Sequence, residues 1–283
     1  MRVLIVGGTS ALAQVLKPVL SGFAEVLTAG RARCDIHLDL SAPAEEVRIP
    51  EGIDSVINLA AHFGGGRDST AMLDAENVNV HGSLKLCQAC TRAGARHLVL
   101  VSSVFASLGS DSPFYGIYAL SKRHAEEVAE LYSATQHLPL TVLRPAQIYG
   151  VGEPFRKHQP FLYAIIDKAE RNEDITFYGS NDARRNLIHA EDVSNVIARV
   201  LQQRVEGRYA CASSSNVSYS EIARSAIAAF GSTATFRFLK DKPDIADNAF
   251  GPDETLYQRI QYFPRIGIAL GMEMEAAHRA ERK

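Results

Sequence analysis

The sequence lacks any apolar run long enough to cross a membrane and any large excess of one charge. No stretch of the 283 residues reaches the ~18 consecutive apolar positions that a spanning helix needs. The formal net charge is −2, so neither nucleic acid nor an anionic membrane surface is expected as a partner. The first residues lack the basic segment and cleavage site of a secretion signal. We therefore expect a cytoplasmic globular protein.

Cysteine is scarce, with four residues in the chain. Cys87 and Cys90 have the spacing of a C-x-x-C pair and lie in a helical run over residues 84–93. No second Cys or His pair lies near them to complete a zinc site, so no metal is expected. Buried thiols on one helix face are favoured over a redox pair.

The first half of the chain alternates short apolar runs with helical stretches. Strands are predicted at 3–6, 25–29, 35–39, 55–60, 97–102 and 140–143, and helices at 11–20, 78–93 and 121–137. Residues 56–59 and 98–101 are nearly continuous hydrophobic runs, typical of strands covered by helices on both faces. The alternation predicts an α/β fold with a doubly wound parallel sheet, the Rossmann architecture.

The pattern changes after about Val151. Residues 151–180 are richer in charge, proline and aromatics, with a helix predicted at 159–171, and a strand and helix return at 186–203. A further helix is predicted at 219–230. We predict a nucleotide-binding core over 1–150, joined by 181–206. A smaller, mostly C-terminal substrate-binding lobe is predicted from 151–180 and 207–283.

A glycine turn, GGTSALA at 7–13, follows the first strand and opens a helix. Dinucleotide pyrophosphates bind at such helix N-termini, on the exposed N–H groups. Only Gly7 matches the G-x-x-G-x-x-G spacing, although Ser10 and Ala13 are small enough to let a ligand approach the backbone. An ordinary strand-to-helix turn remains the alternative. The contacts expected from this turn are Gly7, Thr9, Ser10, Ala11 and Leu12.

The end of the second strand bears on the choice of dinucleotide. An acidic residue there would bind the adenosine ribose, but residues 29–33 read AGRAR. Arg31 or Arg33 could instead pair with a 2′-phosphate, which favours NADP over NAD, unless both are solvated loop charges. Asp39 could accept a hydrogen bond from the adenine amino group, or could be a helix N-cap with Ser41.

Tyr118 and Lys122 stand four residues apart at the start of a predicted helix, so both side chains project from one face. A nearby ammonium favours the phenolate and brings the pKa of tyrosine closer to neutral pH. Tyr118 is therefore predicted to transfer a proton, with a surface pair as the alternative.

Further motifs surround this pair in a characteristic order. They are NLAAH at 58–62, NVNVHG at 77–82, VSS at 101–103, LRPAQIYG at 143–150 and RNLIHAEDV at 185–193. The series resembles the extended short-chain dehydrogenase/reductase family, in particular its NAD(P)-dependent epimerase/dehydratase branch acting on nucleotide sugars. The resemblance covers about residues 1–230.

The resemblance implies a role for each matching residue. Ser103 would hydrogen-bond the reacting oxygen, Tyr118 would be the acid/base, and Lys122 would be its electrostatic partner. Pro145 and Ile148 would lie near the nicotinamide, unless they form a turn and the core. Further cofactor contacts would be Leu40, Leu59, Ala60, Ala61, Asn79, Val101 and Ser102. Substrate contacts would be His62, Gly64, Ser103, Gln147 and Arg185, the last facing a phosphate unless it is a surface charge.

The loop VFASLG at 104–109 departs from the family pattern. Counting back from Gly109 would put Val104 at the catalytic position, but valine makes no hydrogen bond, so Ser103 is preferred. The acidic pair that drives water loss in dehydratases is absent, which argues against a dehydratase. The segment 62–67 is either a substrate loop or a plain surface loop. The pair His189 and Asp192 is expected to anchor a helix rather than to act in catalysis.

These observations predict an NADP-dependent reductase of a 4-keto nucleotide sugar. A nucleotide-sugar 4-epimerase is the alternative, and a non-catalytic NADP-sensing protein is a remote one. Family resemblance also predicts a homodimer formed through residues 78–93 and 121–137.

Overall fold

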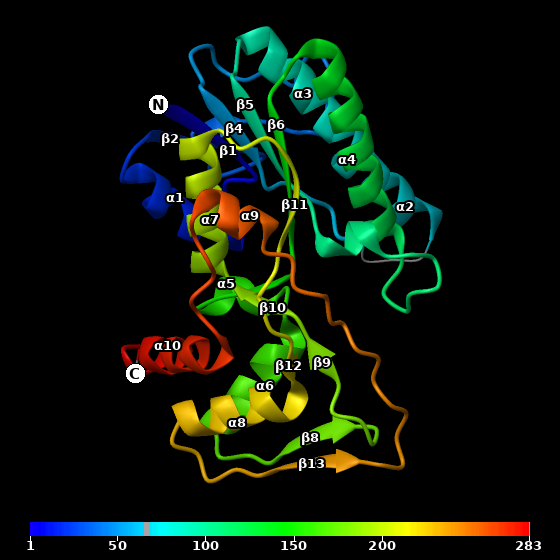
Figure 1. The fold of residues 1–283 in the computed structure, drawn as a ribbon, viewed down its shortest axis with the longest axis vertical. Helices are drawn as coiled ribbons and strands as arrows, with labels where there is room; N and C mark the ends of the chain where they lie inside the picture. Colours follow the sequence, from blue (N-terminus) through cyan, green and yellow to red (C-terminus); the bar gives the residue numbers. More distant parts are fainter. Residues whose placement is uncertain (65–67, 283) are drawn as a thin grey trace. The chain divides into compact units, whose positions relative to one another are not determined.

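A parallel sheet of seven strands organises the first part of the chain (Figure 1). Its strands are β1 (Arg2–Val6), β2 (Glu25–Gly30), β3 (Ile36–His37), β4 (Ser55–Asn58), β5 (His97–Val101), β6 (Leu140–Pro145) and β11 (Gly207–Cys211). They lie in the order β11-β6-β5-β4-β1-β2-β3, and every neighbouring pair is parallel. The chain starts in the middle and winds outward in both directions, so the predicted doubly wound sheet is confirmed. In such sheets ligands bind at the carboxyl ends of the strands, where the order reverses.

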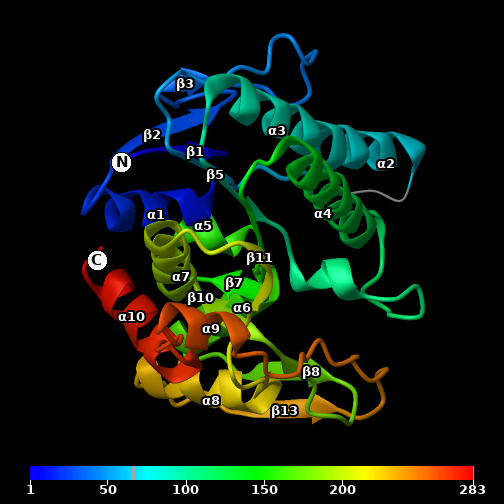
Figure 2. The ribbon, with the colours of Figure 1, turned by 45° about the horizontal axis from the view of Figure 1, so that its top comes forward.

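Helices cover both faces of this sheet (Figure 2). One face carries α1 (Ala11–Ser21) and the second part of α7 (Ala190–Gln203); the other carries α3 (Gly82–Ala93) and α4 (Ile117–Gln136). Leu4, Val56 and Leu98 of the sheet share one buried cluster with Leu86 and Cys87 of α3. Burial between two helical layers explains why these strands are almost continuously apolar.

The computed structural model describes residues 1–64 and 68–282, and it separates into two compact units. Unit 1 comprises Met1–Pro145, Ser194–Cys211 and Thr255–Tyr262, and unit 2 comprises Ala146–Val193, Ala212–Glu254 and Phe263–Lys283. The core predicted from the sequence differs from unit 1, because it included residues 146–150 and the whole of 181–206. The difference arises because β11 extends the main sheet beside β6, and α9 (Thr255–Ile260) packs on β11, whereas the strand after Pro145 pairs within unit 2.

Unit 2 is built from three two-stranded sheets and several helices. The strand pairs are β7 (Gln147–Tyr149) with β10 (Leu187–His189), β9 (Arg184–Arg185) with β12 (Val217–Ser218), and β8 (Ile175–Tyr178) with β13 (Phe236–Leu239). The helices are α5 (Glu153–Arg156), α6 (Pro160–Glu170), α8 (Tyr219–Ala229) and α10 (Ile268–Ala280). Helix α8 packs against both α6 and α10, and Phe177 of β8 contacts Tyr219, Phe236 and Phe238.

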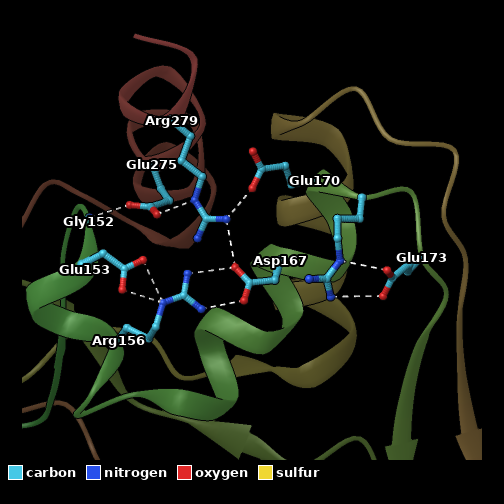
Figure 3. Close-up of polar contacts among 9 residues, drawn as sticks. Gly152, Glu153, Arg156, Asp167, Glu170, Glu173, Glu275 and Arg279 are labelled. Atoms are coloured by element: carbon cyan, nitrogen blue, oxygen red, sulfur yellow. Dashed lines mark hydrogen bonds and ion pairs between the residues drawn. The ribbon is translucent and has the colours of Figure 1, made fainter. Parts of the chain in front are cut away.

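An ionic cluster joins the C-terminal helix α10 to α6 (Figure 3). The Arg279 guanidinium lies 2.9 Å from Asp167, 2.5 Å from Glu170 and 2.7 Å from Glu275. Arg156 approaches the other side of Asp167 at 2.5 Å. This network holds α10, for which the sequence showed no clear signal, to the rest of unit 2.

Several local features differ from the predicted elements. Helix α4 begins at Ile117, four residues before the predicted start, so Tyr118 lies in its first turn. The predicted helix 78–93 is a π-helical turn, η1 (Glu76–His81), that continues into α3. A short helix α2 (Ser69–Ala75) precedes it, and a 3₁₀ turn, η2 (Val104–Ser107), follows β5.

Cys87 and Cys90 are buried in α3 and unoxidised. Burial raises the pKa of Cys87 to about 12 and raises that of Cys90 as well, so both thiols keep their protons. None of the helices that the described residues form has the length and hydropathy needed to cross a bilayer.

Candidate active site

The glycine turn is pressed against the strand ends on either side of β1. Gly7 has a φ of +83°, and a Cβ there would lie 2.7 Å from the backbone nitrogen of Ala60. A Cβ on Gly8 would lie 2.6 Å from Cβ of Thr28. Ser10 caps α1 by accepting the Ala13 N–H at 3.2 Å. The turn therefore needs two adjacent glycines, and the packing of Gly8 is a requirement that the sequence analysis missed, although the Gly-Gly pair signals it.

Past β2, the two arginines and Asp39 have different surroundings. Arg31 and Arg33 are exposed, and Arg33 has a left-handed backbone with a φ of 52°. Asp39 accepts hydrogen bonds from the Ser41 hydroxyl and N–H at 2.7 and 2.9 Å. These two bonds lower the pKa of Asp39, with a smaller contribution from the charge of Arg31. The carboxylate thus caps a turn with Ser41; no helix begins there, so the predicted helix N-cap is wrong, and the predicted contact with adenine stays a prediction.

Asn79 ties the loop after β4 to helix α4. Its side chain accepts the N–H of His62 at 2.7 Å and donates to the His62 carbonyl at 2.8 Å and to the Ser121 hydroxyl at 2.9 Å. Residue 79 lies in the π-helical turn η1, a kind of turn that is frequent at functional sites. The side chain predicted to contact a cofactor therefore supports the loop that carries His62. Of the predicted substrate loop 62–67, residues 65–67 lie outside the described part of the chain.

The structure brings Ser103, and not Val104, to the phenol of Tyr118. The Ser103 hydroxyl lies close enough to the phenol to lower the pKa of Tyr118. Its Oγ accepts the Phe105 N–H at 3.2 Å. Val104 is buried in the 3₁₀ turn η2. The turn starts directly after Ser103 and accommodates the departure of this loop from the family pattern.

Burial raises the pKa of Tyr118 to about 12, and the nearby Ser103 hydroxyl opposes this rise only in part. The expected lowering of this pKa by Lys122 is wrong for this structure. The Lys122 ammonium donates instead to the Val101 carbonyl at 2.8 Å, and burial of the phenol dominates. Tyr118 therefore carries its proton at neutral pH.

Lys122 is itself buried, with 4% of its surface exposed. Burial lowers its pKa to about 8, while the negative charge of Glu126 raises it. Glu126 is fully buried one helical turn further on and is held by Arg144 of β6, whose Nε lies 3.0 Å from the carboxylate. Three charged groups thus occupy the space between α4 and β6.

Several of the other predicted contacts also lie at the carboxyl ends of these strands. Val101 ends β5 and supplies the carbonyl that Lys122 binds. Ser102 donates its N–H to Leu143 at 2.7 Å, and its buried hydroxyl has no hydrogen-bond partner among residues 1–64 and 68–282. A buried hydroxyl without a partner normally indicates a polar group still to be bound. Together with the glycine turn, it fits a dinucleotide cofactor. The remaining predicted contacts on this side are Leu40, Leu59, Ala60, Ala61 and Pro145.

The other predicted residues belong to unit 2. Arg185 donates to the carbonyls of Arg184 and Ala246, each at 2.8 Å, and lies over the ring of Tyr219 at 4.9 Å. Gln147 and Ile148 are in β7. Asp192 accepts the N–H groups of Arg265 and Ile266 at 3.0 and 2.8 Å, so its carboxylate anchors the segment that leads to α10.

Comparison with known proteins identifies the family. The sequence profile of the NAD dependent epimerase/dehydratase family matches residues 3–212. The chain belongs to this family.

Curated relatives are distant. CDP-abequose synthase of Salmonella typhimurium is 25% identical over 57% of this chain and 52% of its own length. A dTDP-4-dehydro-6-deoxy-D-allose reductase of a Streptomyces species is 24% identical over 68% of this chain and 64% of its own. A dTDP-glucose 4,6-dehydratase of Streptomyces griseus is 27% identical over 81% and 73%. The match thus spans about half the length of the first of these relatives.

Solved structures share the fold over nearly the whole chain. UDP-N-acetylglucosamine 4-epimerase from Bacillus cereus superposes with a TM-score of 0.80 at 18% identity, covering 98% of this chain and 99% of that one. UDP-glucose 4-epimerase of Thermus thermophilus, solved in complex with NAD, gives 0.74 at 19% identity and 98% of both chains.

Proposed function

We propose that this protein is an NAD(P)-dependent oxidoreductase that acts on a nucleotide-activated sugar, and that it reduces a 4-keto sugar. The observation that carries the proposal is the placement of the buried Lys122 one helical turn after Tyr118 on α4, with the Ser103 hydroxyl close enough to the phenol to lower its pKa. The phenol of Tyr118 can donate a proton to a carbonyl oxygen. The Ser103 hydroxyl and the Lys122 ammonium are the groups that can assist this transfer.

Tyr118 donates its proton to the ketone oxygen in this proposal, and Ser103 hydrogen-bonds the same oxygen. The raised pKa of Tyr118, about 12, keeps the phenol in the protonated form that a donor requires. In this proposal Lys122 turns its ammonium from the Val101 carbonyl toward the phenolate as the proton leaves, and its positive charge then stabilises that anion. The nicotinamide cofactor, when bound, supplies the hydride, so one hydride and one proton convert the ketone to an alcohol.

We infer that the cofactor is held by Gly7, Thr9, Ser10, Ala11 and Leu12 of the glycine turn, and that NADP is preferred to NAD. Support for NADP comes from Arg31 and Arg33, which are exposed past the end of β2 in place of an acidic residue. Arginine pairs well with a 2′-phosphate, while an acidic residue would bind the ribose hydroxyls of NAD.

A dehydratase activity is disfavoured by the residues next to Ser103. Val104, Phe105 and Ala106 form the 3₁₀ turn there, and none of them can remove or donate a proton. Among the relatives, the reductases are therefore the better guide to the reaction than the dehydratases. A 4-epimerase uses the same Tyr118 to remove a proton and return it, and the fold likeness to 4-epimerases keeps this as the second candidate.

The decisive experiment follows reduced cofactor during conversion of 4-keto and 4-hydroxy nucleotide sugars carrying CDP, dTDP or UDP. A reductase consumes one reduced cofactor for each product molecule, whereas an epimerase converts its substrate with no net consumption. Tyr118→Phe is expected to lower kcat by about 10²–10⁴-fold while cofactor affinity is retained. Normal turnover by this variant would refute the assignment, and turnover of no substrate by the wild type would favour an NADP-sensing protein.

We also propose a homodimer formed through α3 and α4. Light scattering coupled to size-exclusion chromatography tests it directly.

A further inference from the structure

Phe63 is an exposed aromatic residue that stacks on the tyrosine of the candidate active site. Its side chain is 55% exposed, yet its ring lies on that of Tyr118 with the centroids 5.1 Å apart and the planes inclined by 20°. Phe105 meets the same phenol edge-on at 6.5 Å, and Phe114 stacks on Phe105 at 6.2 Å. Three phenylalanines therefore form a continuous apolar surface that includes the Tyr118 ring.

The backbone on either side of Phe63 is anchored, so the stack is built into the fold. The His62 backbone donates one hydrogen bond to the Asn79 side chain and accepts one from it, and Asn79 donates in turn to Ser121 of the helix that carries Tyr118. On the other side, the Gly64 N–H donates to the His62 ring at 3.1 Å. A Cβ on Gly64 would lie 2.6 Å from the Ile117 side chain, so the chain passes directly against α4.

The cations that α4 carries near this surface are already engaged elsewhere. Lys122 donates to the Val101 carbonyl. The Arg123 guanidinium donates to the carbonyls of Ala106 and Leu108 and lies over the ring of Tyr115. A substrate group placed against Phe63 would therefore meet the aromatic carbon of these rings.

We propose that Phe63 positions the sugar and makes the enzyme selective for deoxy sugars, in which a carbon near the reacting carbonyl carries hydrogen or methyl instead of hydroxyl. This inference rests on the proposed reduction at Tyr118. Once the ketone oxygen is bonded to Tyr118 and Ser103, the neighbouring carbons of the sugar lie within reach of the rings beside the phenol. A methyl group loses nothing on leaving water for such a surface, whereas an unpaired hydroxyl loses its hydrogen bonds.

The test compares two ketones on the same nucleotide, a 4-keto-6-deoxyhexose and the corresponding 4-keto-6-hydroxyhexose. The wild type is expected to prefer the deoxy sugar in kcat/KM by about 10–100-fold, the range over which an apolar site discriminates against an added hydroxyl. In Phe63→Ala this preference should fall about tenfold, mainly through a higher KM for the deoxy sugar. Phe63→Tyr keeps the stacked ring and should keep the preference within about threefold.

Leu270→Ala is the control, because Leu270 is an exposed apolar residue of α10, a helix that belongs neither to the candidate site nor to the proposed dimer interface. It should leave both ketones unaffected. If Phe63→Ala slows both ketones by the same factor, Phe63 merely supports Tyr118 and the selectivity role is overturned while the proposed reduction stands. Turnover of neither ketone by the wild type, on CDP, dTDP or UDP, would instead overturn the reduction and this inference with it.

Discussion

At the scale of single residues, the charge on Lys122 depends on one buried carboxylate. Tyr118, Lys122 and Glu126 follow one another at intervals of four, so they share a face of α4. Glu126 is completely buried, and Arg144 and Arg208 approach it at 2.5 and 3.6 Å. A buried ammonium is costly without a nearby negative charge, and Glu126 is the group that raises the pKa of Lys122.

Glu126→Gln should therefore lower the pKa of Lys122 below its value of about 8. Since the proposed mechanism needs a charged Lys122, the alkaline fall in kcat/KM should move to lower pH in the variant. A pH–rate profile measures this shift. Glu127→Gln, at the exposed neighbouring position, is the control and should keep the wild-type profile. Coinciding profiles for wild type and Glu126→Gln would show that Glu126 does not act on Lys122.

The second residue-scale prediction concerns Gly8, which the glycine spacing of the family does not single out. In Gly8→Ala the new methyl would lie 2.6 Å from Cβ of Thr28 and 3.1 Å from Sγ of Cys34. Relieving this overlap should cost about 1–3 kcal/mol of stability and weaken dinucleotide binding at the same turn.

Because the chain has no tryptophan, circular dichroism is the suitable probe of unfolding, and titration calorimetry reports the affinity for NADP. Gly251→Ala has open space around its added Cβ and should change neither quantity. If Gly8→Ala had wild-type stability, β2 could shift to accommodate the new methyl group at no cost in free energy, and the predicted steric requirement for Gly8 would be wrong.

At the scale of elements, helix α10 depends on Arg279 (Figure 3). Asp167, Glu170 and Glu275 all contact its guanidinium, which is largely buried. Another attachment of the helix near this point is the Gly152 N–H, which donates to Glu275 at 2.7 Å. Removal of the cation would leave three carboxylates close together with little solvent to separate them.

Arg279→Met should thus destabilise unit 2 by about 3–5 kcal/mol, the usual cost of breaking a buried ion pair from one side. Limited proteolysis should then cleave near α10 faster than in the wild type. Arg282→Met, one turn on at an exposed position, provides the comparison and should resist cleavage as the wild type does. Unchanged proteolysis of Arg279→Met would show that apolar packing of α10 on α8 suffices.

At the scale of the whole molecule, buried histidines link stability to pH. His97 lies in β5 with its Nε2 2.8 Å from the Thr141 hydroxyl, and that hydroxyl donates onward to the Val205 carbonyl. Burial, with a smaller contribution from Arg204, lowers the pKa of His97 from 6.5 to about 4. The folded protein therefore resists protonation, and the unfolded chain takes up the proton first as the pH falls.

The stability due to a neutral His97 is fully present above pH 6.5 and is lost as the pH falls toward 4. Between pH 7 and pH 5 the wild type should lose about 2 kcal/mol more than His97→Gln, which keeps a donor but does not titrate. Urea unfolding at the two pH values measures the difference. His81 is exposed, so His81→Gln should lose as much stability between the two pH values as the wild type does. Equal losses of stability in the wild type and in His97→Gln would show that His97 is not the group that links stability to pH.

Prediction from the sequence succeeded where the pattern is local. The apolar runs at 56–59 and 98–101 correctly predicted buried parallel strands. Helices cover both faces of the sheet, so side chains on either face of these strands are buried. It failed for α10 and for β11: α10 is held largely by charges from distant parts of unit 2, and β11 is a strand only because β6 lies beside it.

The order of the motifs around Tyr118 and Lys122 was enough to identify the family. The four-residue spacing of this pair was enough to propose it as the reacting pair, because residues four apart on a helix project from the same face. The choice of Ser103 over Val104 was already reached from the sequence. Which way the pKa of the phenol moves and which ring covers it were decided by the tertiary structure alone. Ser103, Tyr118 and Phe63 come from three separate segments, and their burial and ring contacts exist only after those segments pack.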